Sequence, residues 1–331
     1  MFPYYSLLLI QTKKITFMIN RFFAKLYEQP KRSLYLPVFR VYIAFHLLKK
    51  LLFQWTSLET LYGLDSFLGK GGIYIFHIAV DWHWFLANYQ LLTFLYMIVL
   101  VLFAFGIGKH FTALIVLIFV EIFQGMNSYV LNGGDNLLKF QMIYMTFCDS
   151  YQYLAFSKLK FKSAVTQKIS NMLTNLAVCS IIIHLALVYF TTGLHKAHAD
   201  AWFNGVATYY TLSLERFAGT RYNALIVKNG YFVTLTTYFT LLWELSFAFV
   251  VWYKKLRVYV LLCGVMLHLG IYIFMMIHDF QILYVMTYGL FFTDNEIKSF
   301  ASRLQTKMRN VFNKISFGTP KEPEYTEVSA Q

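Results

Sequence analysis

The chain has 331 residues, of which 58% are hydrophobic and 20% aromatic, and it carries a formal net charge of +13. Only 14% of the residues are charged, whereas a soluble domain of this size has about 25%. Several continuous apolar runs exceed the ~18 residues that mark a membrane-spanning helix. These runs are continuous rather than alternating, which argues against a membrane β-barrel. The sequence therefore predicts an all-α, polytopic integral membrane protein.

We expect eight membrane-spanning helices packed as a bundle, with further helices lying at the membrane surface in the outer loops. Polar residues interrupt the fourth expected span, and the eighth is short enough to be tilted or partly re-entrant. The expected spans are 34–54, 89–107, 111–131, 136–156, 171–193, 230–253, 257–277 and 280–293.

The distribution of positive charge predicts the orientation. With the N-terminus in the cytoplasm, 20 of the 29 Lys and Arg residues fall in cytoplasmic segments and 5 in outer loops. This bias follows the positive-inside rule, so both termini are expected in the cytoplasm and the chain in the bacterial inner membrane. The basic balance then reflects topology and contact with membrane lipids, and no nucleic-acid partner is expected.

No cleavable signal peptide is expected, because the apolar run Tyr4–Ile10 is short and has no basic region before it. Met18 begins an alternative start, MINRFFAKLYEQPKRS, which would make residues 1–17 an upstream extension. The polar C-terminal end reads as disordered. The expected parts are a basic cytoplasmic segment 1–33, a transmembrane domain 34–293 and a cytoplasmic tail 294–331.

Two outer loops are long, 55–88 and 194–229. The first contains Trp82 and Trp84, which suit a helix at the membrane surface because indole rings prefer the headgroup level. The second holds a polar cluster described below.

Polar side chains lie at membrane depth, where they must face protein or water rather than lipid. They are interpreted either as interhelical hydrogen bonds, worth ~0.6–2 kcal/mol each, or as the lining of a shared polar cavity. Arg40 would reach inner-leaflet phosphates or pair with a buried acid. Lys49 and Lys50 would extend to the outer headgroups, and Lys139 would pair with Asp135 at i, i+4. The other polar groups are Glu121, Gln124, Asn127, His184, Glu244 and His268.

The most informative stretch is Ile181–Gly205, an apolar run holding His184 that ends in a polar cluster and then Trp202. Ionisable groups at the mouth of a membrane helix are functional candidates. His195 and His198 could ligate a metal on a helix, but such a pair is more often an interfacial polar cluster, so no metal is expected. The cluster comprises His195, Lys196, His198 and Asp200.

The segment YFTTGLHKAHADAWFNG (Tyr189–Gly205) resembles a pattern of the HTTM (horizontally transferred transmembrane) superfamily, Y-F-x-x-G-x-x-K followed by W-x-x-G. That superfamily comprises the vitamin K-dependent γ-carboxylases and their bacterial relatives. Leu261–Phe292 resembles its late histidine-bearing helix and the aromatic helix that follows. Asn132–Phe147 resembles its segment after the third helix. The likeness extends over residues 35–293, the whole expected membrane core.

The resemblance implies a catalytic base. In the γ-carboxylases, the second lysine of a G-x-K-K motif deprotonates vitamin K hydroquinone, and Lys196 falls on that position. A lysine desolvated beside an apolar cavity loses part of its preference for the ammonium form, which suits a base. His195, which replaces the first lysine, His198 or His268 would orient or relay the proton. The residues expected to line the substrate cavity are Arg40, Asp135, His184, Trp202, Glu244 and His268.

The sequence also departs from the family pattern. One extra residue separates Lys196 from Trp202, and an ungapped comparison puts Gly134 where the carboxylases place a functional histidine. The chain has no counterpart of their large lumenal domain, which binds the propeptide and the glutamate substrate. Full vitamin K-dependent carboxylation is therefore not expected. A membrane protein that handles a quinol or another lipidic substrate is expected instead, with a quinone or quinol as the candidate cofactor.

A non-enzymatic membrane protein is the alternative, similar to the SdpB-like immunity or export accessory factors of the same superfamily. Lys196 and Trp202 would then anchor the outer loop at headgroup level, and a membrane or exported protein would be the partner. A transporter is a third interpretation, but the sequence shows neither an inverted repeat nor a pair of broken helices.

Overall fold

The computed structural model describes residues 16, 17, 21, 24, 26–28, 30, 32–66, 74–75, 78–79, 81–217 and 219–316. These residues are predominantly α-helical. They include one short antiparallel ladder, in which β1 (Tyr74–Ile75) pairs with β2 (Ile78–Ala79). Contacts divide the chain into two units, Met1–Phe291 and Phe292–Gln331, and each is described by itself.

Within the described residues, four helices are long and apolar enough to cross a membrane. The predicted membrane character is therefore confirmed at this level. The fifth expected span, 171–193, is longer than predicted, because Ser163 and Thr166 form a capping box that starts the helix earlier. The four helices are α6 (Lys109–Met126), α8 (Ala164–Ala197), α12 (Gly230–Val250) and α13 (Lys254–Met275).

Two further helices lie where spans were expected, and the second of them is short and apolar. These are α2 (Tyr35–Phe53), which carries Arg40, Lys49 and Lys50, and α5 (Tyr89–Ala104), which has 16 residues. Shorter helices occupy the loops that were expected to face outward and to carry surface helices. They are α3 (Leu58–Tyr62), α4 (Trp82–Ala87), α9 (Asp200–Phe203), α10 (Ala207–Ser213) and α11 (Asn223–Lys228), with single 3-10 turns at Trp55–Ser57, Ser128–Val130 and Glu215–Phe217.

The prediction of a helix over 136–156 was wrong in its second half. Helix α7 (Gly133–Met145) has only 13 residues; the Asn132 capping box starts it and it ends at Met145. The chain then turns back toward α5, and the Phe156 N–H donates to the Phe105 carbonyl at 2.8 Å. The last expected span is also short: α14 (His278–Tyr288) is followed by a single 3-10 turn, η4 (Gly289–Phe291).

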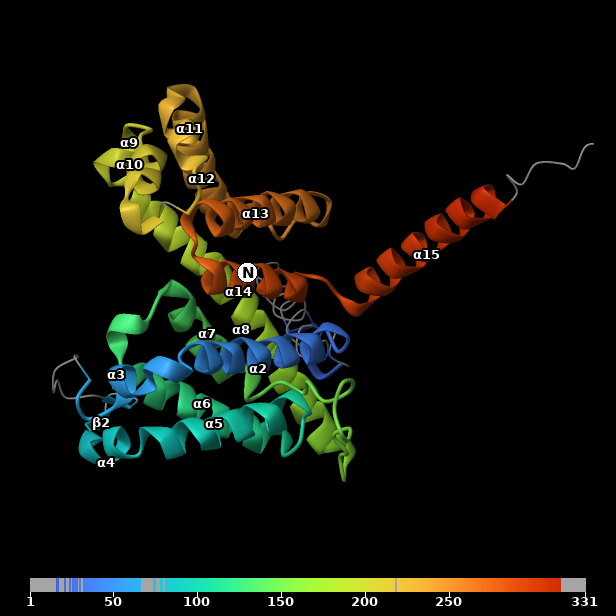
Figure 1. Cartoon of the computed structure of the whole chain (residues 1–331). Coiled ribbons are helices and arrows are strands. Elements are labelled where there is room, and N and C mark those ends of the chain that lie inside the picture. The colour runs from blue at the N-terminus through green and yellow to red at the C-terminus, as the bar shows by residue number, and fades with distance from the viewer. Residues whose placement is uncertain are drawn as a thin grey trace, which may run out of the picture. The chain divides into compact units, whose positions relative to one another are not determined.

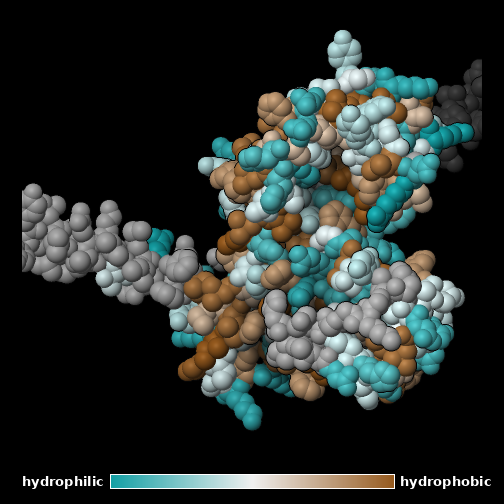
Figure 2. Space-filling view, turned by 90° about the vertical axis from the view of Figure 1, so that its left-hand side faces the viewer, coloured by the Kyte–Doolittle hydropathy of each residue, from teal (hydrophilic) through white to brown (hydrophobic). Residues whose placement is uncertain are grey.

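Helix α8 connects two groups of helices in the first unit (Figure 1). α2, α5, α6 and α7 pack together on one side, and α12 packs along α8 on the other, with α13 beside it. α14 packs against α13, α7 and α2 and so joins the two groups. Figure 2 shows the end that carries α3, α4, α9 and α10, where hydrophilic and hydrophobic residues alternate and the surface is hollowed near its centre.

Several charged residues that were expected at membrane depth pair between helices. Lys49 is paired with Asp279, and Lys50 with Asp135 at 2.5 Å. The expected extension of these lysines to the headgroups remains a prediction; what the structure shows is that carboxylates from α14 and α7 lie within reach of both ammonium groups. The predicted i, i+4 pair was wrong: Lys139 Nζ lies 2.9 Å from the Glu121 carboxylate of α6.

Arg40 is fully buried and takes neither of its expected partners. Its guanidinium donates to the main-chain carbonyls of Ser150, Ala104 and Leu154, and it lies 5.2 Å from the ring centroid of Tyr151. Those carbonyls belong to the end of α5 and to the irregular segment after α7. Carbonyls in such places have no N–H donor within a helix. Arg40 therefore satisfies main-chain carbonyls of the chain reversal that replaces the second half of the expected fourth span.

The second unit contains α15 (Asp294–Ser316), where only a polar tail was expected. Thr293 and Glu296 form a capping box at its start, with the Thr293 N–H and hydroxyl each 2.8 Å from Glu296 Oε2. The expected disorder of the end of the tail falls on 317–331, outside the described residues, as does most of the basic segment 1–33.

Candidate functional site

The motif residues of α8 lie on the helix face that packs against α12. Tyr189, Gly193 and Lys196 follow one another at i, i+4 and i+7, which places them on one side of a helix. A Cβ at Gly193 would lie 3.0 Å from the Leu245 side chain and 3.2 Å from its backbone nitrogen. The missing side chain therefore lets the two helices approach closely just below Lys196.

That close approach joins Lys196 to Glu244 of α12. The Lys196 ammonium donates to Glu244 Oε1, and the Thr192 hydroxyl lies 3.4 Å from Oε2. The side chain of Glu244 is 8% exposed and that of Lys196 is 27% exposed. The carboxylate is thus buried with its charge compensated, while the lysine still reaches open space.

Trp202 covers the other side of the lysine. The Lys196 ammonium lies 4.7 Å from the centroid of the indole ring, within the range of a cation–π contact. The chain can turn after α9 because Gly205 adopts φ +72°, where a Cβ would meet the Tyr238 ring at 2.9 Å. Tyr238 Oη donates to the Phe203 carbonyl at 2.6 Å and fixes the same turn. Gly205, the glycine of W-x-x-G, therefore permits the turn that places the Trp202 indole over Lys196.

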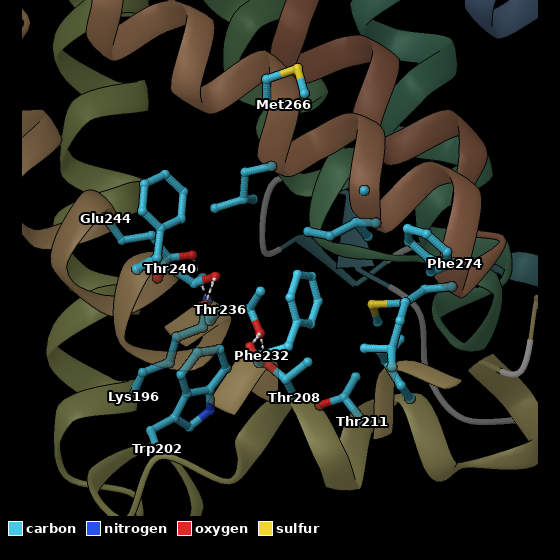
Figure 3. A pocket seen from close by; sticks show the side chains of 17 residues that line it. Lys196, Trp202, Thr208, Thr211, Phe232, Thr236, Thr240, Glu244, Met266 and Phe274 are labelled. Carbon is cyan, nitrogen blue, oxygen red and sulfur yellow. Dashed lines mark hydrogen bonds and ion pairs between the residues drawn. The ribbon is translucent and has the colours of Figure 1, made fainter. Parts of the chain in front are cut away.

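Lys196, Trp202 and Glu244 form one wall of a cavity of about 350 Å³ (Figure 3). This volume is within the range of small-molecule sites, about 300–1,000 Å³. Aromatic and aliphatic side chains from α12 and α13 line most of it, and threonine hydroxyls face it from α10 and α12. The other lining residues are Thr208, Thr211, Leu212, Ile226, Phe232, Thr236, Phe239, Thr240, Met266, Leu267, Gly270, Ile271, Phe274 and Met275.

His268 lies close to this site but does not line the cavity. It is buried, and its Nδ1–H donates to the Gln281 side-chain oxygen. Its Nε2 and the Tyr189 hydroxyl share a hydrogen bond of 2.6 Å, and Tyr189 is also 2.6 Å from the Tyr288 hydroxyl. The chain of groups links α8, α13 and α14 directly beneath Gly193. Gln281 and Tyr288 were not predicted, because isolated polar residues in an aromatic helix gave no motif.

The remaining predicted site residues lie elsewhere. His195 and His198 are exposed and do not line the cavity, and His198 Nδ1 contacts the Leu194 carbonyl at 2.8 Å. His184 is half-buried with its ring against Phe140. Arg40 binds the chain reversal described above, and Asp135 pairs with Lys50. Of the nine predicted site residues, the structure therefore brings only Lys196, Trp202 and Glu244 together at the cavity.

Gly134 borders a small gap of about 10 Å³ between α2, α7 and α14. A Cβ at Gly134 would lie 2.9 Å from the Asn132 side chain and 3.1 Å from Phe280, so no larger residue fits. His46 of α2 lines the same gap with Lys50. The His46 imidazole thus lies beside Gly134, although it belongs to α2 and not to the segment Asn132–Phe147. Comparison of that segment alone could not reveal it.

We expect Gly193→Ala to lower the free energy of unfolding by about 1 kcal/mol. A helix normally gains about 1 kcal/mol from Gly→Ala, but here the Cβ forces α8 away from Leu245, and overpacking costs about 1–3 kcal/mol. Gly270→Ala is the matched control, because a Cβ there meets nothing within 4 Å, so this variant should be as stable as wild type or more so. Thermal unfolding in detergent measures both; equal gains in stability would contradict the close contact.

No family model, no curated protein and no solved structure matches this chain. Its function therefore has to follow from the geometry of the site.

Proposed function

We propose that the chain is a multi-pass membrane protein of the HTTM/γ-carboxylase-like superfamily that binds a quinol or a similar lipidic molecule in the cavity beside Lys196. Eight spans in the inner membrane, with both termini cytoplasmic, are part of this proposal. The likeness of Tyr189–Gly205 to the superfamily pattern supports it. The observation that carries it is the ion pair between the buried Glu244 and the partly exposed Lys196 at the wall of an apolar cavity.

The cavity suits an amphiphilic ring. Phe232, Phe239 and Phe274 offer apolar contacts, whereas Lys196 and Glu244 supply a donor and an acceptor at one wall. A few convergent polar groups in an otherwise apolar cavity orient a ligand and select its head group. A quinone oxygen would accept from the lysine, and a quinol hydroxyl would donate to the carboxylate.

The pair can also move a proton. Transfer from the Lys196 ammonium to the Glu244 carboxylate leaves a neutral amine and a neutral acid, a change favoured by low polarity because burial disfavours charge. The amine then accepts the proton of a bound hydroxyl. The net result is one proton on Glu244, an anionic oxygen on the ligand and an ammonium beside it, which stabilises that oxygen. Lys196 acts as the base and Glu244 as the final acceptor.

The test is native mass spectrometry with lipid extraction of the protein purified in mild detergent, as wild type, Lys196→Ala and Lys139→Ala. Lys139 is the matched control. Its side chain is 31% exposed and pairs with the buried Glu121, but it lies outside this cavity. We expect a co-purifying quinone or quinol in wild type and Lys139→Ala, and its loss in Lys196→Ala.

Two results would contradict the proposal. The same lipids in all three proteins, or an empty cavity in wild type, would favour a structural role for the pair and with it the immunity or export-accessory interpretation. Deletion of 194–229 would then abolish binding of the protein partner, whereas Lys196→Ala would be nearly silent.

A further inference from the structure

Helix α15 of the second unit presents one continuous apolar face. At 100° per residue, Phe300, Leu304, Met308 and Phe312 fall within an arc of about 120°. Their exposed fractions are 70%, 49%, 52% and 66%. An apolar face of this length normally needs a cover, because exposed contiguous apolar surface marks an interaction site.

Basic residues border that face on both sides. Lys298 and Arg309 lie beyond one edge of the arc, and Arg303 and Lys307 beyond the other, each within about 60° of the edge. The opposite side of the helix is polar and uncharged. The two acidic residues stand in the first turn, where they favour the positive end of the helix dipole. The residues opposite the apolar face are Ser302, Thr306 and Asn310.

We propose that α15 lies flat on an anionic lipid surface, with its apolar face among the acyl chains and its basic borders on lipid phosphates. Lysine and arginine at the border of an apolar face can keep their stems in the apolar layer and their charges at the headgroups. A helix that lies on an anionic leaflet has lipid phosphates along both of its sides. Positive charge on both borders of the apolar face matches this arrangement. Only Phe292 and Thr293 separate α15 from η4, so the helix stays tethered to helices that can cross the membrane.

The experiment uses the full chain in nanodiscs, with Cys148, Cys179 and Cys263 replaced by alanine. A fluorophore is attached either at Leu304→Cys, on the apolar face, or at Thr306→Cys, on the opposite side. Brominated acyl chains quench a label inside the bilayer, and acrylamide quenches a label in water. Discs of phosphatidylcholine alone are compared with discs that also contain phosphatidylglycerol.

With phosphatidylglycerol present, we expect bromolipid to quench the label at Leu304→Cys and acrylamide to quench the label at Thr306→Cys. Arg303→Gln with Lys307→Gln should reduce the bromolipid quenching, as should high salt, because salt screens surface charge. Several results overturn the proposal: acrylamide quenching of both labels, protection of the Leu304→Cys label from both quenchers, which would place the face against protein, or equal bromolipid quenching in the two kinds of disc.

Discussion

Replacing Arg40 with methionine is expected to lower the free energy of unfolding by about 4 kcal/mol, although Arg40 touches neither the cavity nor the paired lysine. The guanidinium donates to the carbonyls of Ser150, Ala104 and Leu154 and is fully buried. Methionine fills similar space but leaves these carbonyls without donors, and an unsatisfied buried polar group costs about 1–3 kcal/mol. Unfolding by heat or by SDS in detergent micelles measures the loss.

Arg40→Lys should fall between wild type and Arg40→Met, because one ammonium keeps the charge but lacks the planar fork that reaches several carbonyls. Phe45→Leu is the control on the exposed face of the same helix, where 63% of the residue is accessible; it should change stability by no more than about 0.5 kcal/mol. If Arg40→Met unfolds like wild type, these hydrogen bonds do not hold the chain reversal.

The second large effect is expected at the Lys196–Glu244 pair. Lys196→Leu leaves the Glu244 carboxylate buried without its counter-charge, and the free energy of unfolding should fall by about 3 kcal/mol. Glu244→Gln should cost less, about 1 kcal/mol, because the lysine is 27% exposed and can turn to water. The double variant Lys196→Leu with Glu244→Leu should recover much of the loss, since no charge then remains buried.

This cycle separates stability from ligand binding. The double variant should fold nearly as well as wild type and still fail to retain the ligand, because the head-group partners are gone. Lys49→Leu should change stability by no more than about 1 kcal/mol, because both members of its pair with Asp279 are only half-buried and the Asp279 carboxylate keeps contact with solvent. Additive losses in the double variant would show that the two side chains do not stabilise each other.

If both results hold, the two cations have different tasks. Arg40 is enclosed by main-chain carbonyls and has no room for a ligand, so its task is to stabilise the turn after α7. Lys196 has one buried partner and one open side, which faces the cavity. A charge that is compensated but still accessible can bind or exchange a proton, and this accessibility is why Lys196 carries the proposed function.

The sequence alone determined that the chain is helical and apolar enough for a membrane, and it located most of the long helices. These features are local, because a continuous apolar run and its capping residues lie within one segment. It also placed Lys196 and Trp202 in one motif, since both follow the same apolar run. The prediction of a helix failed over 146–156, because the chain turns back there although several of its residues are apolar.

Only the tertiary structure decided which partner each charge takes. Lys196 and Glu244, or Lys50 and Asp135, are far apart in the sequence, and each lysine had several carboxylates available in principle. Their pairing depends on how closely the helices pack, which Gly193 sets for α8 and α12. The cavity has the same origin: its lining comes from α8, α9, α10, α11, α12 and α13. Hydropathy acts along the chain, whereas ion pairs and cavities arise where separate helices meet.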